Sequence, residues 1–248
     1  HTFVIRDLGE DNSRTITMTS TQINTTPVQN VSTIETNAGR VGYLTFNDHI
    51  SSAESQLIDA MALLSASNIS DLILDIRYNG GGFLDIANEL AYMIAGDTAA
   101  GQIFETLVFN EQHPNFDPVT GRPLTPTRFH TTAQGFSTPS GTPLPKLGLT
   151  RVFVLTGPGT CSASESIINS LKGINVEVIQ IGETSCGKPY GFYPFDNCGT
   201  TYFSIQFRGE NQKGFGGYSD GFTPSNSLST TAEPLPGCLV SDDFTRQL

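Results

Sequence analysis

The chain has 248 residues, with 13 lysines and arginines against 24 aspartates and glutamates, a net charge of −11 at pH 7. Such an excess of carboxylates repels phosphate, so we expect no nucleic-acid partner. The apolar runs are far shorter than the roughly 20 residues that a membrane-spanning helix needs. With 37% hydrophobic and only 15% charged residues, the composition is typical of a folded chain rather than a disordered one.

The first predicted element is a β-hairpin within residues 3–18, because two short β-type runs flank the turn-prone GEDNS. The polar residues 19–33 indicate a linker. We therefore expect a terminal segment, residues 1–30, followed by one main domain, residues 31–248. The sequence begins with His1 and no basic-then-apolar leader follows, so we expect a piece of a longer protein.

From residue 40 onward, apolar runs of strand type alternate with stretches of helical periodicity. This alternation with short connections indicates an α/β domain with a largely parallel sheet. Residues 109–148 have no periodicity, which is typical of a lid or a mobile loop. The predicted strands are 40–46, 71–78, 151–157 and 176–182, and the predicted helices are 51–67, 83–96 and a third that begins at Ser162.

Four cysteines, at positions 161, 186, 198 and 238, form no CxxC pair and lie far from the histidines in sequence. We therefore expect no structural zinc site. Cys186 and Cys198 flank a segment rich in glycine and proline and are the pair that we expect to form a disulfide loop. An even number of cysteines with few lysines favours an exported protein. Four reduced thiols in a cytosolic protein are the alternative.

Two predicted strand-to-helix turns contain residues suited to chemistry, and the first is NGGG at 79–82. Free N–H groups of a glycine turn, with a helix dipole behind them, suit a negatively charged oxygen. That oxygen could belong to a phosphate or to the oxyanion formed in acyl transfer. The phosphate-loop patterns GK[ST] and GxGxxG are absent. A glycine turn that only reverses the chain is the alternative.

The second turn is GPGTCSASES at 157–166, where Ser162 could be a nucleophile at a helix N-terminus. Ser162, Ser164 or Thr160 could equally be an ordinary N-cap. The GxSxG motif is absent, and no motif connects a histidine to a serine. A hydrolase that uses His113 or His130 remains a further reading.

Lys188 follows the predicted strand 176–182 and could approach Ser162, because adjacent parallel strands end at the same sheet edge. A lysine base must be neutral, which requires desolvation and no close carboxylate such as Glu183. A surface lysine is the alternative reading of Lys188.

Together these segments resemble the carboxyl-terminal processing, or tail-specific, serine peptidases. The resemblance implies a ClpP/crotonase-like spiral of ββα units as the catalytic domain, with the hairpin of residues 1–30 as the remnant of a PDZ-like domain. The segments that carry it occur in the family's order: VGYLTF (41–46), DLILDIRYNGGG (71–82), VLTGPGTCSASES (154–166), IGETSCGKPYG (181–191) and DGFTP (220–224).

The resemblance also implies a Ser–Lys dyad, with Ser162 as nucleophile and Lys188 as general base. The oxyanion hole would use the amide of Ala163 and that of Gly81, with Gly80 as the neighbouring alternative. The family often has glutamine four residues after the lysine, where this chain has Phe192. We therefore expect Tyr190 or a backbone carbonyl to support Lys188.

The implied activity is that of a serine endopeptidase that cleaves unstructured or C-terminal protein segments through an acyl-enzyme. It would act on protein or peptide substrates without a cofactor or metal, in the bacterial periplasm, at the cell envelope or as a secreted protein. The alternative is an inactive binding module of the same fold that carries a peptide or a lipophilic ligand.

Overall fold

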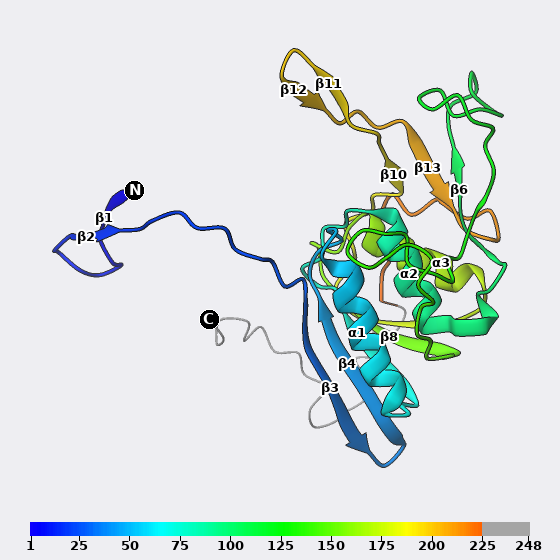
Figure 1. Cartoon of the computed structure of the whole chain (residues 1–248), viewed down its shortest axis with the longest axis horizontal. Coiled ribbons are helices and arrows are strands. Elements are labelled where there is room, and N and C mark those ends of the chain that lie inside the picture. The colour runs from blue at the N-terminus through cyan, green and yellow to red at the C-terminus, as the bar shows by residue number, and fades with distance from the viewer. Residues whose placement is uncertain (225–248) are drawn as a thin grey trace, which may run out of the picture.

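The computed structural model describes residues 1–224 and is built around a five-stranded sheet in the order β3–β4–β5–β8–β9 (Figure 1). β3 pairs antiparallel with β4, whereas β4, β5, β8 and β9 are parallel to one another. The predicted α/β class with a largely parallel sheet is therefore confirmed. The five strands are β3 (Val28–Thr36), β4 (Gly39–Phe46), β5 (Asp71–Asp75), β8 (Arg151–Thr156) and β9 (Glu177–Gly182).

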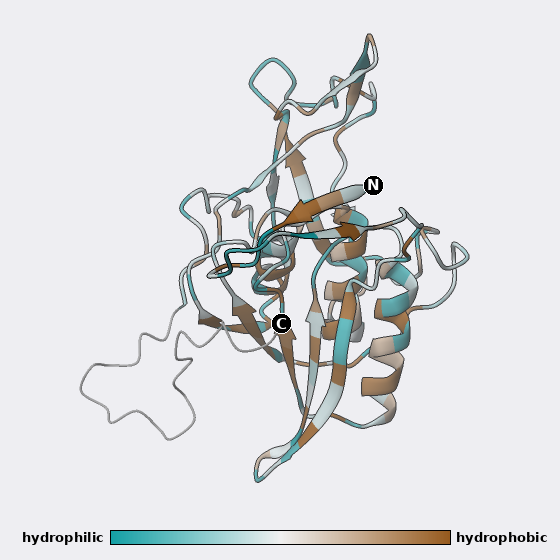
Figure 2. Cartoon of the chain, turned by 90° about the vertical axis from the view of Figure 1, so that its left-hand side faces the viewer, coloured by the Kyte–Doolittle hydropathy of each residue, from teal (hydrophilic) through white to brown (hydrophobic). Residues whose placement is uncertain are grey.

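The three predicted helices are present as α1 (Ala53–Ala66), α2 (Leu84–Ala95) and α3 (Ala163–Gly173), with a short 3-10 turn, η1 (Gly96–Thr98), after α2. α2 and α3 pack against each other and are buried along most of their lengths. Figure 2 shows hydrophobic residues concentrated on the central strands and on the helices. Within residues 1–224, none of the helices is both long and apolar enough to cross a membrane.

A second, antiparallel sheet has the order β10–β13–β6–β7. A small hairpin, β11 and β12, extends from it at the top of Figure 1. The sequence did not predict β6. These elements are β6 (Ile103–Val108), β7 (Thr127–Arg128), β10 (Tyr190–Gly191), β11 (Phe195–Asn197), β12 (Thr200–Tyr202) and β13 (Phe207–Glu210).

The predicted N-terminal hairpin is confirmed, because β1 (Thr2–Ile5) pairs antiparallel with β2 (Arg14–Thr17). It lies apart from the rest of the chain at the end of an extended segment (Figure 1). The linker prediction is wrong for residues 28–33, which belong to β3. β3 is an edge strand whose side chains are mostly exposed, and polar residues on an exposed strand carry little hydropathy signal.

Residues 109–148 are irregular, as expected, and contain only the two-residue strand β7. The second half of the segment is nevertheless fixed to the core. Phe129, Ala133 and Leu144 are buried there. The Glu54 carboxylate of α1 also accepts the N–H of Gly135 at 2.9 Å. Any lid movement is therefore better suited to the first half of the segment.

Candidate active site

The candidate active site lies where the parallel strands end. The residues after β4, β5, β8 and β9 meet at one sheet edge, because the carboxyl ends of parallel strands lie side by side. A cavity of about 950 Å³ opens there and is lined by Ser162, Lys188, Gly80 and Gly81, among others. Four of the five catalytic and oxyanion-hole residues expected from the sequence therefore line the same cavity. The fifth, Ala163, is buried at the start of α3.

Ser162 lies on a sharp turn between β8 and α3. Its φ of 58° and ψ of −120° are unusual for a residue with a side chain, so the turn is strained. The Ser162 N–H donates to Glu165 Oε2 at 3.0 Å. Because α3 begins at Ala163, the hydroxyl stands at the positive end of the helix dipole, next to the Ala163 N–H.

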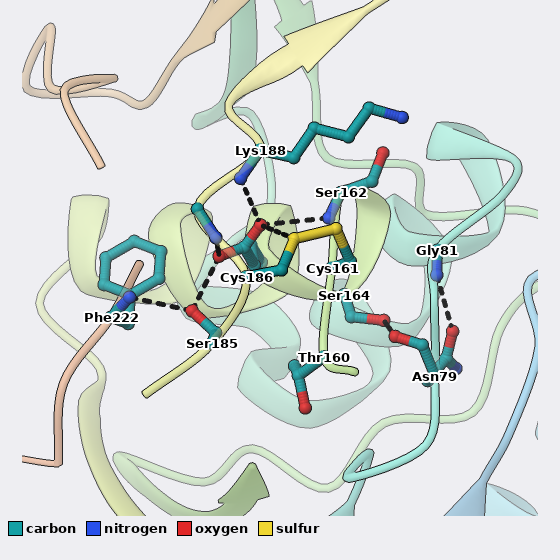
Figure 3. The surroundings of a disulfide bond; sticks show 12 residues. Asn79, Gly81, Thr160, Cys161, Ser162, Ser164, Ser185, Cys186, Lys188 and Phe222 are labelled. Carbon is teal, nitrogen blue, oxygen red and sulfur yellow. Dashed lines mark hydrogen bonds between the residues drawn. A yellow bond between two sulfur atoms is a disulfide. The ribbon is translucent and has the colours of Figure 1, made fainter. Parts of the chain in front are cut away.

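The glycine turn after β5 is fixed by a buried asparagine (Figure 3). Asn79 Oδ1 accepts the Gly81 N–H at 3.0 Å and lies 2.9 Å from His49 Nδ1. The Asn79 side-chain amide in turn donates to the carbonyl of Phe46 at 3.0 Å. At Gly81 φ is 96°, and a Cβ there would lie 2.7 Å from the carbonyl oxygen of Cys161. Only glycine fits this close approach between the two turns.

The same asparagine connects the glycine turn to the Ser162 turn through its backbone. Its carbonyl accepts the Cys161 N–H at 3.1 Å and the Ser164 hydroxyl at 2.9 Å. Thr160 donates its hydroxyl to the carbonyl of Ile76 at 2.8 Å. Ser164 and Thr160, both candidate caps in the sequence, therefore hold the two turns together.

The candidate oxyanion donors differ in their hydrogen bonding. The Gly81 amide already donates to Asn79. The Gly80 and Ala163 N–H groups have no acceptor in the described part of the chain, whereas the Gly81 N–H is held by Asn79.

Lys188 lies on the loop after β9 and extends beside Ser162, with its amine on the same side as the hydroxyl (Figure 3). Its Nζ lies 4.6 Å from the centroid of the Phe192 ring. In the described part of the chain the amine has no hydrogen bond or ion pair, so Glu183 does not hold it. The expected support by Tyr190 or a carbonyl is therefore wrong: the Phe192 ring itself contacts the amine.

Sequence reasoning missed Glu165, a buried carboxylate that joins the two turns. It accepts the N–H of Gly187 and the N–H of Lys188, each at 2.8 Å, and the Ser185 hydroxyl at 2.6 Å. Glu165 also accepts the Ser162 N–H, so its carboxylate connects the turn that contains Ser162 to the loop that contains Lys188. Its position three residues after Ser162, in SASE, is the only signal that could have indicated it.

The predicted disulfide between Cys186 and Cys198 is wrong. Cys186 is joined instead to Cys161, and their Cα atoms are 5.2 Å apart (Figure 3). Residues before α3 and after β9 meet at the same sheet edge, whereas Cys198 is an exposed free thiol in the β11–β12 turn. Cys238 lies outside the described residues.

The disulfide also argues against a metal site at Cys161, Glu165 and Cys186. Cys161, Glu165 and Cys186 place one sulfur or oxygen atom each within 4.8 Å of one another, an arrangement that could hold a metal ion. Because the two sulfurs are bonded to each other, they are not thiolate ligands. We therefore assign this cluster to the link between the two turns.

The histidines give little support to a histidine-based hydrolase. His130 Nε2 lies 2.9 Å from Asp85 Oδ1, and neither His130 nor His113 lines the cavity. His49 does line it and is fully buried. Burial lowers the pKa of His49 to about 4, so its ring is neutral at pH 7. Its bond to Asn79 makes it a support of the glycine turn.

Comparison with known proteins gives matches to one group. The model of peptidase family S41 matches residues 40–192. The "Carboxyl-terminal-processing protease" of Picosynechococcus sp. is 25% identical over 179 residues, which cover 72% of this chain and 36% of that protein.

Two solved structures share the fold. A protein of Bacteroides fragilis NCTC 9343 assigned as an S41 protease has a TM-score of 0.70 at 22% identity, over 90% of this chain and 57% of its own. The photosystem II D1 C-terminal processing protease has a TM-score of 0.57 at 20% identity, over 90% of this chain and 54% of its own. The chain thus spans little more than half of these two solved proteins, and about a third of the curated one.

Proposed function

The chain belongs to peptidase family S41, and from this we propose that it is a serine endopeptidase with Ser162 as nucleophile and Lys188 as general base. The observation that carries the proposal is the cavity shared by the two side chains. Ser162 enters it from a strained turn at a helix N-terminus, and Lys188 enters it with an amine that no carboxylate within residues 1–224 holds. Both features favour nucleophilic catalysis.

The reaction would proceed through two transfers at Ser162. Lys188 Nζ takes the hydroxyl proton while Ser162 Oγ bonds to the scissile carbonyl carbon. The amides of Ala163 and of Gly80, or of Gly81 once it releases Asn79, bind the oxyanion. Lys188 then gives its proton to the leaving amine as the C–N bond breaks. Water hydrolyses the acyl-enzyme by the same steps, and the proton returns to Ser162.

The proposed substrates are unstructured protein segments or C-terminal tails. A cavity of about 950 Å³ admits an extended chain but not a folded domain. The small antiparallel sheet next to it offers strand edges along which such a segment could lie. The Phe104 and Phe207 side chains, which also line the cavity, favour apolar contacts with the substrate.

Four further assignments belong to the same proposal. The main domain would form the ClpP/crotonase-like spiral of ββα units, and the β1–β2 hairpin would be the remnant of a PDZ-like domain. The irregular segment 109–148 would act as a lid in its first half. The protein would work outside the cytoplasm, which the disulfide supports because such bonds persist in oxidising compartments.

A non-catalytic binding module is the second candidate. It is favoured by the contact of Lys188 with Phe192, because the amine is not hydrogen-bonded to Ser162. The aromatic lining of the cavity would also suit a lipophilic ligand.

A cleavage assay distinguishes the two candidates. The purified chain is incubated with a reduced, alkylated protein and, separately, with the same protein in its folded state. We expect the unfolded form alone to be cut, with fragments identified by mass spectrometry. Absence of fragments together with tight binding of a fluorescent fatty acid would instead favour the binding module.

Removal of the disulfide should lower both stability and activity. The Cys161→Ser, Cys186→Ser double variant should lose about 3 kcal/mol of unfolding free energy in urea, since the bond closes a loop with a sequence separation of 25 residues. Hydrolysis should fall by up to about 10²-fold, because the segments of Ser162 and Lys188 are then held less firmly. Cys198→Ser, which removes only the exposed free thiol, is the matched control. Unchanged hydrolysis in the double variant would contradict this role of the bond.

A further inference from the structure

A narrow side pocket of about 80 Å³ opens beside Ser162 and Lys188. The mechanism proposed above gives it no role. Both apolar and polar side chains line its walls, and Glu105 of β6 is the only carboxylate that lines it among the described residues. The volume is too small for a ligand of ordinary size and suits a single side chain. The apolar wall residues are Gly82, Leu84, Pro189, Gly191, Phe192 and Phe207.

The Glu105 carboxyl group is buried, and within residues 1–224 it forms no ion pair. Its side chain lies among β6, α3 and β13, and the residue is 7% exposed. Its only hydrogen bond within residues 1–224 is from the Ser166 hydroxyl at 3.5 Å, a long and weak one. At Gly209 a Cβ would overlap Glu105 Oε1, so the strand beneath is shaped to leave room for the carboxyl group.

A buried carboxyl group without a counter-ion is a cost to folding. An apolar side chain of the same size would avoid that cost, so a structural role alone gives no reason for glutamate at this position. Burial raises the pKa of Glu105 to about 7, and a cation placed next to it would favour its charged form. Lysine and arginine have apolar stems that suit the walls of the pocket and charged ends that suit the carboxylate.

We propose that this side pocket receives the substrate side chain on the amino side of the scissile bond and that Glu105 selects lysine or arginine there. The inference rests on the proposed function, because Ser162, which lines the pocket, defines where the scissile bond lies. The acyl group attached to Ser162 carries that side chain, which brings it next to the pocket.

The selection should depend on pH. Glu105 loses its proton as the pH rises through about 7, so the preference for a basic side chain should be strong at pH 8 and weak at pH 6. Burial raises the pKa of the nearby Tyr218, and the Glu105 carboxylate raises it further. The other titratable groups that line the side pocket or the main cavity are His49, Asp85, Lys188, Tyr190 and Tyr193.

The test uses peptides that differ only in the residue before the scissile bond, which is lysine, arginine or leucine. Glu105→Gln should lower kcat/KM for the basic peptides about 10- to 100-fold more than for the leucine peptide. Glu10→Gln, which changes an exposed glutamate of the terminal hairpin, should leave the ratio unchanged. Asp85→Asn tests the other cavity carboxylate, which is near His130.

Labelling of Ser162 by a small fluorophosphonate separates the two proposals. If Glu105→Gln is still labelled and the basic preference is lost, the inference holds. If kcat/KM of the wild type is equal for the leucine and lysine peptides, the inference is wrong and the peptidase assignment stands. The same holds if Asp85→Asn removes the preference and Glu105→Gln does not. Absence of both labelling and cleavage in the wild type would overturn both. Should Glu105→Gln not fold, the wild-type preference for lysine over leucine at pH 8 decides, and its absence contradicts the inference.

Discussion

Replacement of Ser162 by alanine should abolish peptide hydrolysis and leave the fold intact. Loss of the nucleophile removes the acyl-enzyme route, and we expect kcat/KM to fall by at least about 10⁴-fold. The melting temperature should change little, because alanine can keep the same backbone turn and the Ser162 N–H can still donate to Glu165. Hydrolysis of an unfolded protein and thermal unfolding followed by circular dichroism measure the two effects.

Ser13→Ala is the matched control, because this serine is exposed in the turn of the terminal hairpin. Its turnover should equal that of the wild type. Turnover retained in Ser162→Ala would remove Ser162 from the mechanism. A large loss of stability in that variant would mean that the serine hydroxyl is structural.

Lys188→Met should have the second-largest effect. Methionine keeps an unbranched apolar stem that can still pack on Phe192 but removes the amine, so general-base catalysis is lost and the rate should fall about 10²- to 10⁴-fold. No ion pair within residues 1–224 is broken by this change, so the fold should persist. The measurement is kcat/KM as a function of pH.

Lys188→Arg distinguishes a role of Lys188 as general base from a role as a positive charge that only supports the structure. A guanidinium group stays protonated at all relevant pH values, so arginine should not restore the rate. Recovery in Lys188→Arg would show that only positive charge is needed at this position and would contradict the role as base. Lys146→Met is the control, because Lys146 forms an exposed ion pair with Asp97.

The fold could be predicted where hydropathy follows burial. β5 and β8 lie in the interior of the sheet and were found from their apolar runs, whereas the helices were found from their helical periodicity. β3 was missed because it is an exposed edge strand with polar residues. β6 was missed because it lies in the second sheet, where Glu105 interrupts its apolar run.

The sequence predicted those parts of the candidate site that a single motif contains. Ser162, Lys188 and the glycine turn each lie next to a strand whose end the βαβ rule brings to the same edge. The disulfide partner of Cys186 and the links made by Glu165 depend on contacts between turns that are far apart in sequence. Distance along the chain therefore favoured Cys198, although the fold places Cys161 beside Cys186.

The most direct test of the account is covalent labelling followed by peptide mapping. The wild-type protein is treated with a fluorophosphonate, which reacts with activated serine nucleophiles, and the modified residue is located by mass spectrometry. We predict a single adduct on Ser162, formed far more slowly in Lys188→Met. An adduct on another residue, or equal labelling rates in the two proteins, would contradict the claim that Ser162 is a nucleophile activated by Lys188.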